Sequence, residues 1–322
     1  MRPFELTAPS TVDDALATPG TVLAGGTTLV DLMKLDVLTP QHIVDITALP
    51  LRGVHGTATE GLRIGALERM SDVAAHPGVP PVVTRALLLS ASQQLRNMAT
   101  IGGNLMQRTR CSYFRDVTVG CNRREPGSGC PAVHGANRMH AILGTSDSCV
   151  ATHASDLAVA LVALDARLRL VHADGERTVA LTDFYRTPGD TPQIEHDLAD
   201  GEIISEIVVP PVPDPVRSTY VKVRDRASYE FALCSAAVVL DVQDGRVADA
   251  RVAVGGVGTV PWPLPAVADA LRGGPVTEEA FEAAAASAAD GARPLSQNAY
   301  KMSLVRRTVV RALLEATEED RA

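Results

Sequence analysis

The chain has 322 residues, which is too long for one ordinary hydrophobic core and predicts two or three domains. Its net charge of −8 argues against nucleic acid as a main partner, because binding phosphates requires a basic face. No apolar run is long enough to span a bilayer, and the N-terminus lacks the layout of a signal peptide. We therefore expect either a cytoplasmic protein or one that is exported on a partner's signal.

Short strands and helices are expected to alternate over the N-terminal third. The elements predicted there are a strand over 21–24, a helix over 28–34, a strand over 42–46 and a helix over 82–98. Thr28 and Asp31 resemble a capping box at the start of the first helix. In the second helix, Leu87, Leu88, Ala91 and Leu95 are expected to share one face. This alternation predicts a region with mixed helices and strands.

A different texture follows in the rest of the chain. Residues 106–150 are rich in Gly, Arg, Ser and Pro and show no sustained periodicity, so they predict an ordered loop. A helix is expected over 155–164, and residues 190–200 are expected to form a loop. The last third predicts strands over 219–224, 236–242 and 247–254, with a hairpin turn at Asp244-Gly245, and helices over 265–272, 277–290 and 299–316. Strands first and helices after them predict an α+β domain.

Four of the five cysteines lie within 39 residues, at Cys111, Cys121, Cys130 and Cys149. Four thiolates match an iron–sulfur cluster or a structural zinc, and the absence of a C-x-x-C pair favours a cluster. Six arginines lie between residues 106 and 149 and are expected to offset the negative charge of such a cluster. A surface loop with incidental cysteines is the alternative. Cys234 lies among apolar residues and is expected to be an inert core thiol.

Two junctions between a strand and a helix contain paired glycines, Gly25-Gly26 and Gly102-Gly103. Glycines let a phosphate approach the backbone, although neither junction fits a common nucleotide fingerprint and a simple turn is an alternative. Two such junctions suggest a long ligand with a pyrophosphate. Asp156 stands at the start of a helix, where its spacing alone favours a capping role over binding a ribose.

Taken together, these motifs resemble the flavoprotein (medium) subunit of the molybdenum hydroxylases, the xanthine dehydrogenase and aldehyde oxidoreductase family. The matching segments are 23–29, 100–104, 155–157, 220–222 with Arg226, and 255–258, and they occur in the family's order along essentially the whole chain. The cysteine loop interrupts two of the FAD motifs. That position resembles a subgroup of bacterial periplasmic aldehyde oxidoreductases whose FAD subunit contains an additional 4Fe–4S cluster.

The resemblance implies a fold, a domain organisation and two cofactor sites. It implies a two-part FAD-binding domain of the vanillyl-alcohol-oxidase type, at 1–55 and 56–213, with an iron–sulfur insert at about 106–150, followed by an α+β C-terminal flavoprotein domain at 214–322. The residues implied to bind FAD are Leu23, Ala24, Gly25, Gly26, Thr27, Thr28, Leu29, Thr100, Ile101, Gly102, Gly103, Asn104, Asp156, Ile204 and Lys222. The ligands implied for the 4Fe–4S cluster are Cys111, Cys121, Cys130 and Cys149. In this reading Asp156 binds the adenosine ribose.

The function that the resemblance implies is electron transfer within a heterotrimeric oxidoreductase. A large subunit with a molybdenum cofactor would oxidise an aldehyde or heterocycle. Electrons would then reach the FAD of this chain through 2Fe–2S clusters on a small subunit, and leave to an external acceptor. No residue of this chain is expected to be catalytic toward the organic substrate. The alternatives are a self-contained flavin oxidase and a zinc-stabilised adaptor that is not catalytic. The compartment would be the periplasm, through a partner's signal, or the cytoplasm.

Overall fold

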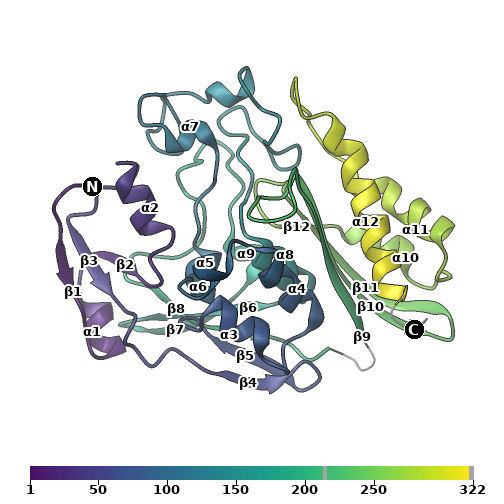
Figure 1. Cartoon of the computed structure of the whole chain (residues 1–322), viewed down its shortest axis with the longest axis horizontal. Coiled ribbons are helices and arrows are strands. Elements are labelled where there is room, and N and C mark those ends of the chain that lie inside the picture. Colours follow the sequence, from purple (N-terminus) through teal and green to yellow (C-terminus); the bar gives the residue numbers. More distant parts are fainter. Residues whose placement is uncertain (213–215, 319–322) are drawn as a thin grey trace.

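Three sheets organise the computed structural model, which describes residues 1–212 and 216–318 (Figure 1). A small parallel sheet has the order β1-β3-β2, with β1 at Glu5–Thr7, β2 at Thr21–Leu23 and β3 at His42–Asp45. An antiparallel sheet has the order β4-β5-β8-β6-β7, with strands at Val54–Thr57, Gly61–Gly65, Ile203–Val209, Arg167–His172 and Gly175–Ala180 in that order. The third sheet, also antiparallel, is β12-β11-β10-β9, at Trp262–Pro263, Arg246–Gly255, Cys234–Gln243 and Val216–Val223.

Most helices of the described residues are short. The helices are α1 Val12–Ala17, α2 Leu29–Lys34, α3 Met70–Ala75, α4 Pro81–Leu89, α5 Gln93–Arg96, α6 Ile101–Leu105, α7 Ser112–Arg115, α8 Asp156–Ala163, α9 Leu181–Phe184, α10 Pro265–Leu271, α11 Glu278–Ala285 and α12 Tyr300–Glu318. Two 3₁₀ turns, at Pro131–Val133 and Ala286–Ala289, complete them. Within the two described ranges, no helix is both long enough and apolar enough to cross a membrane.

The C-terminal sheet is buried on both faces, and its strands show why. Along β10, Val238 and Leu240 join the core formed with α10, α11 and α12, whereas Ala237 and Val239 join the core of the FAD-binding region. Successive side chains of a strand point to opposite faces, so an apolar strand can belong to two cores at once. The second core includes α4 and the wholly buried α8, which both pack against this sheet. The two halves of the molecule are thereby joined by continuous apolar packing.

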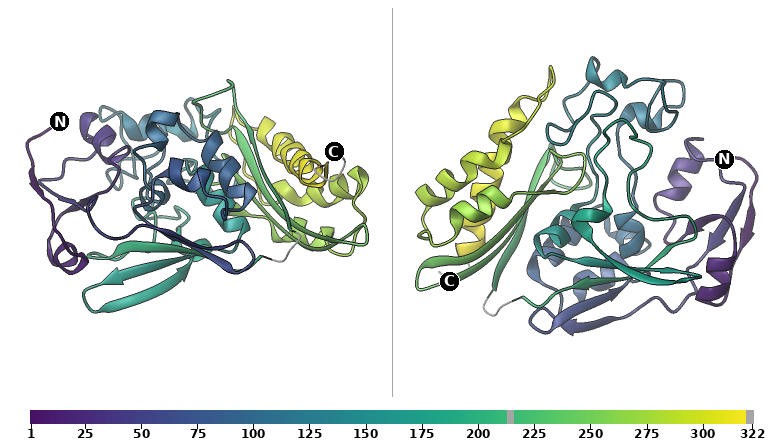
Figure 2. Two further views of the ribbon diagram at one scale, coloured as in Figure 1. Left: turned by 60° about the horizontal axis from the view of Figure 1, so that its bottom comes forward. Right: turned by 180° about the vertical axis from the view of Figure 1, so that it is seen from behind.

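The cysteine segment lies between the N-terminal unit and the C-terminal helices, as the views in Figure 2 show. It contains only α7 and one 3₁₀ turn as regular helix, so its order depends on contacts with its neighbours. On one side, Asp31 of α2 accepts hydrogen bonds from Arg110 at 3.0 Å and from Arg115 at 2.8 and 3.1 Å. On the other side, the backbone and side chain of Asn137 bond to Gln297 at 3.2 and 2.9 Å. The segment therefore bridges two units that are distant in sequence.

Most predicted elements are present, and three predictions are wrong in detail. The expected helix over 82–98 is two helices, α4 and α5, separated at Ala91, whose φ of +49° is left-handed and cannot continue a helix. Leu88 was expected to share a face with Leu87 but is 54% exposed, because it lies on the side of α4 opposite the buried face that Val82 and Ala86 help to form. The capping box at Thr28 is absent, because this residue is helical itself and its side chain makes no capping bond.

Candidate functional site

An elongated cavity runs between the small parallel sheet and the rest of the FAD-binding region. Its first part, of about 350 Å³, lies against the turn after β2 and is closed on the far side by β8 and the preceding loop. Its second part, of about 400 Å³, lies toward the C-terminal sheet. Thr27, Thr28 and Gly103 line both parts, so the two are neighbours along one path. Such a shape suits a long dinucleotide better than a compact metabolite.

The glycine turn after β2 is built by close backbone contact. A Cβ atom on Gly25 would lie 2.1 Å from the carbonyl oxygen of Met98 and 2.9 Å from Cα of Ala99. Gly26 has a φ of +72°, the left-handed region that favours glycine. The turn therefore needs both glycines, and it brings the backbone before α6 against the backbone before α2. The two glycine junctions predicted from the sequence thus meet at one wall of the cavity.

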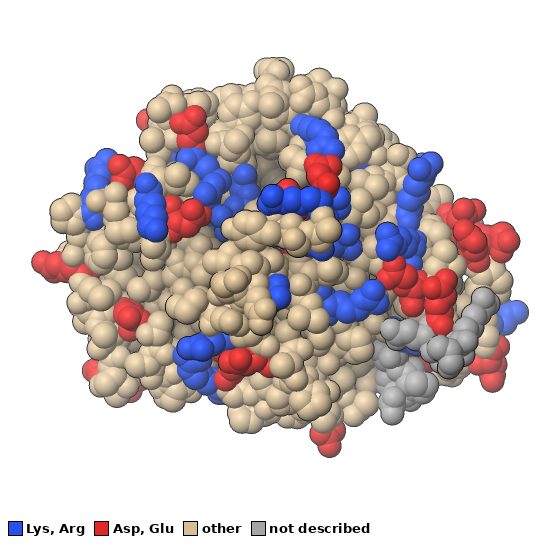
Figure 3. Space-filling model, viewed as in Figure 1, with Lys and Arg blue, Asp and Glu red and all other residues tan. Residues whose placement is uncertain are grey.

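The second part of the cavity is rich in charge. Four cations, Arg110, Arg115, Lys222 and Arg226, line it together with three carboxylates, Asp31, Asp156 and Glu230. The hydrogen bond from Arg115 to Asp31 is the main cause that holds the pKa of this carboxyl below its ordinary value. Figure 3 shows Lys and Arg side chains around a hollow on this face of the molecule. The surplus of cations makes this part suited to an anionic or electron-rich ligand.

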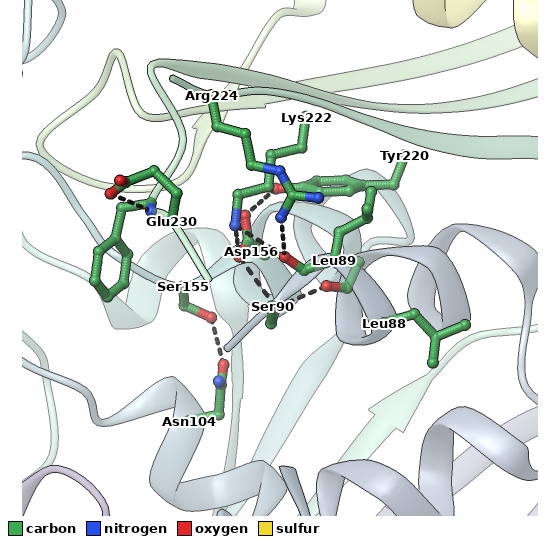
Figure 4. Close-up of polar contacts among 12 residues, drawn as sticks. Leu88, Leu89, Ser90, Asn104, Ser155, Asp156, Tyr220, Lys222, Arg224 and Glu230 are labelled. Carbon is green, nitrogen blue, oxygen red and sulfur yellow. Dashed lines mark hydrogen bonds and ion pairs between the residues drawn. The ribbon is translucent and has the colours of Figure 1, made fainter. Parts of the chain in front are cut away.

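Asp156 is the centre of a buried polar cluster between α8 and β9 (Figure 4). Its carboxylate accepts hydrogen bonds from Tyr220 at 2.6 Å, Lys222 at 2.7 Å and Ser90 at 3.0 Å. The capping role that spacing favoured is wrong, because Ser155 caps α8 by accepting the amide of Ala158 at 2.9 Å. The ribose role implied by the resemblance stays a prediction. The cluster itself ties the C-terminal sheet to the FAD-binding region.

Four cysteines converge in the insert. Cys111, Cys121, Cys130 and Cys149 all line one small cavity, and none of them forms a disulfide. A hydrogen bond with Cys130, together with nearby Arg123, lowers the pKa of the Cys149 thiol below its ordinary value. The same hydrogen bond is the main cause that raises the pKa of Cys130. The lowered pKa favours the thiolate form of Cys149, which is the form that binds metals.

The other thiols have different neighbours. Burial raises the pKa of the Cys111 thiol to about 11, and the ring nitrogen Nε2 of His140 lies 3.2 Å from its sulfur. Phe114 packs with Cys121 in a small apolar core that also contains Leu32 of α2. Cys234 lies apart from this group, fully buried in β10, as expected for a core thiol.

Comparison with known proteins places this geometry in a family. Residues 2–212 match the family described as FAD binding domain in molybdopterin dehydrogenase, and residues 219–316 match the CO dehydrogenase flavoprotein C-terminal domain. The chain is an FAD-binding medium subunit of the molybdenum hydroxylase family. The resemblance to this family therefore holds. The FAD cofactor, the fold class and the assignment to an oxidoreductase, which the motifs implied, are confirmed.

Relatives of this medium subunit span nearly its whole length. It is 46% identical to the aldehyde oxidoreductase FAD-binding subunit PaoB of Escherichia coli, covering 91% of this chain and 90% of that one. It is 29% identical to the glyceraldehyde dehydrogenase medium chain of Sulfolobus acidocaldarius, over 90% and 86% of the two chains. Among solved structures, a carbon monoxide dehydrogenase chain from Hydrogenophaga pseudoflava matches with a TM-score of 0.75 at 27% identity, covering 98% and 97% of the two chains.

Most residues predicted to bind FAD in this medium subunit line the elongated cavity. Those in its first part are Ala24, Gly25, Gly26, Thr27, Thr28, Leu29, Thr100, Gly102, Gly103 and Ile204, and those in its second part include Thr27, Thr28, Gly103, Asn104, Asp156 and Lys222. Leu23 and Ile101 are not among the lining residues, and Ile101 is fully buried in the core beneath α6. Thr100 also caps α6, since its hydroxyl accepts the amide of Gly103 at 3.2 Å.

Several cavity residues escaped sequence reasoning. Arg108, His196 and Leu198 line the first part of the cavity, and the last two come from a stretch that was predicted only as a loop. Burial lowers the pKa of His196, so the imidazole beside the cavity is neutral. The sequence offers little signal for these two positions, since His196 and Leu198 flank a single acidic residue, Asp197, in a segment without periodicity.

Proposed function

We propose that this medium subunit holds both FAD and a 4Fe–4S cluster and passes electrons within a heterotrimeric aldehyde oxidoreductase. The observation that supports the cluster is the convergence of Cys111, Cys121, Cys130 and Cys149 on one cavity of the insert. Bound flavin exchanges one or two electrons, and a bound cluster exchanges one. The chain's own residues hold these groups, orient them and exclude water from them.

The donor set suits a polynuclear cluster better than zinc. Structural zinc requires its four ligands within about 2.3 Å of a single point. In the described parts of the chain, no three His, Cys, Asp or Glu side chains are placed to hold one metal ion. The wide sequence spacing of the four cysteines, with no C-x-x-C pair, supports the proposed cluster over the zinc-stabilised adaptor.

The proposed partners are a large subunit with the molybdenum cofactor and a small subunit with 2Fe–2S clusters. The family membership supports them, because the relatives are named as medium chains or subunits of larger oxidoreductases. On this proposal the organic substrate is oxidised on the large subunit, and this chain delivers the electrons to an external acceptor. A partner with an export signal would take the complex to the periplasm, and without one it would stay in the cytoplasm.

The spectrum and metal content of the anaerobically purified chain test the proposal. We expect flavin bands with a broad iron–sulfur shoulder that dithionite bleaches, and about four irons with sulfide. The Cys121→Ser variant should lose the shoulder and keep the flavin bands. Cys234→Ala is the matched control, because this thiol does not line the cluster cavity, and it should keep both signals. Zinc without iron in the wild-type chain would refute the cluster.

A self-contained flavin oxidase is the second candidate. Its own prediction is turnover of an aldehyde by the isolated chain. Residues predicted to bind FAD line both parts of the described cavity, so we expect no turnover until the large and small subunits are added. Steady-state assays of the isolated chain and of the reconstituted complex separate these two candidates.

A further inference from the structure

The six arginines of the insert contact different groups. Arg110 and Arg115 bind Asp31, and Arg138 binds Asp225 at 2.7 and 2.9 Å. Arg124 donates to backbone carbonyls, and Arg108 pairs with Glu195. Among the described residues, Arg123 is the arginine of this group that donates to a cysteine sulfur, with Nη2 3.6 Å from Sγ of Cys149. The sequence predicted that all six arginines would surround the cysteines, but among the described residues only the guanidinium of Arg123 donates to a cysteine sulfur.

Arg123 is held in place from the opposite side. Its side chain is only 7% exposed, and its Nη1 lies 2.5 Å from Oε2 of Glu195. The same carboxylate contacts Nε of Arg108, which lines the first part of the FAD cavity and stacks over the Phe114 ring at 5.0 Å. Phe114 in turn lines the cysteine cavity. Glu195 thus joins a cation at the cysteines to a cation at the flavin site.

We infer that Arg123 is a positioning residue that sets the reduction potential of the cluster at the four cysteines, with Glu195 moderating its charge and fixing its orientation. This inference rests on the proposed cluster and goes beyond it, because it assigns control of the reduction potential to one side chain. The pair is nearly dry, so its charges are weakly screened by solvent.

The sign of each effect follows from charge. Reduction adds one electron to the cluster, so the reduced state is stabilised more than the oxidised state by a nearby cation and by an N–H donor to sulfur. Removing the guanidinium in Arg123→Met should therefore lower the midpoint potential. Removing the carboxylate charge in Glu195→Gln leaves the cation less compensated and should raise it. Opposite shifts from two contacting residues are not expected from a merely structural role.

The test is a redox titration of the cluster in the purified FAD-containing chain, followed by electron paramagnetic resonance, with iron measured in each sample. We expect a negative shift in Arg123→Met, a smaller negative shift in Arg123→Lys, and a positive shift in Glu195→Gln. The matched control is Arg138→Met, an insert arginine whose side chain is 49% exposed and pairs with Asp225, and its potential should equal that of the wild type.

The outcomes separate this inference from the proposal beneath it. Wild-type protein without iron would refute the cluster itself. Wild-type protein with full iron, and Arg123→Met with full iron and an unchanged potential, would overturn the role of Arg123. If Arg123→Met lost its iron, Glu195→Gln would decide, and a negative or absent shift in that variant would overturn the inference.

Discussion

Lys301 on α12 is fully buried, and its amine donates to the carbonyl oxygens of Met139 at 3.0 Å and Gly256 at 2.6 Å. It therefore joins the insert, the C-terminal sheet and the last helix at one point. Burial lowers its pKa from 10.5 to about 8. The folded protein holds this proton less tightly than the unfolded chain does. Below pH 8 both states are protonated, so the cost of burying the charged amine lowers the free energy of unfolding in full.

We predict that stability relative to a Lys301→Met variant rises with pH. As pH increases from 8 to 10.5, the folded protein releases the proton before the unfolded chain does, and this penalty is relieved. The shift corresponds to about 3 kcal/mol in the free energy of unfolding. Chemical unfolding of both proteins across this range measures the difference, and other titrating groups cancel because both proteins contain them. A difference that stays flat would contradict the lowered pKa.

For single residues, the sequence indicates which residue types serve a function, but it does not show which side chains contact one another. The four cysteines and the glycines of both junctions were predicted because few other residues can do their chemistry or adopt their backbone. Glu195 and Arg123 could not be paired from sequence, since they are 72 residues apart and only the fold brings them together. The partners of Asp156 could not be found from sequence either, because Asp156 begins α8 whereas Tyr220 and Lys222 belong to strand β9.

At the level of elements, α2 is the helix that ties the insert to the FAD-binding turn. We predict that Asp31→Asn loosens residues 109–116 by about 1 kcal/mol, because Arg110 and Arg115 lose an ionic acceptor that is partly exposed. Hydrogen exchange in that segment should become about fivefold faster. Asp36→Asn is the control, since that carboxylate lies near the N-terminal amine at 3.8 Å and not near the insert. Equal exchange in both variants would contradict the tie.

The interaction of Asp31 with Arg110 and Arg115 depends on pH. The pKa of Asp31 is lowered chiefly by its hydrogen bond with Arg115, so its contribution is complete above the ordinary value of 3.8 and is lost as pH falls below it. The insert should therefore stay anchored to α2 throughout the neutral range. Faster exchange in residues 109–116 at pH 6 than at pH 7, after correction for intrinsic rates, would argue against this assignment.

Elements with strong periodicity were easier to predict than those set by tertiary context. The C-terminal hairpin follows from Asp244-Gly245, whose φ values of +51° and +71° suit the turn that these residues favour. The sheet β4-β5-β8-β6-β7 was missed, because its strands come from distant segments and many of their residues are charged. Nor does sequence reveal the break at Ala91, since alanine favours helices and only packing forces it into the left-handed region.

Across the whole molecule, the insert connects the N-terminal unit with the C-terminal domain while containing little regular structure of its own. Its order should therefore depend on the proposed cluster at its four cysteines, in addition to the anchors at both ends. Loss of that cluster should leave the two large cores intact, because their apolar contacts do not include the insert's thiols at Cys111, Cys121, Cys130 and Cys149.

We predict that the Cys121→Ser variant is cut by trypsin within the insert at least about tenfold faster than the wild type, equivalent to about 1.4 kcal/mol less free energy of local opening. Trypsin is the suitable probe, because Arg123 and Arg124 become accessible only when their contacts with Glu195 and with the carbonyls of Tyr113 and Phe114 open. Mass spectrometry identifies the cleavage sites, and Cys234→Ala is the control. Equal cleavage rates would mean that the flanking anchors alone hold the insert, whereas cuts spread over the whole chain would mean that both cores depend on the cluster.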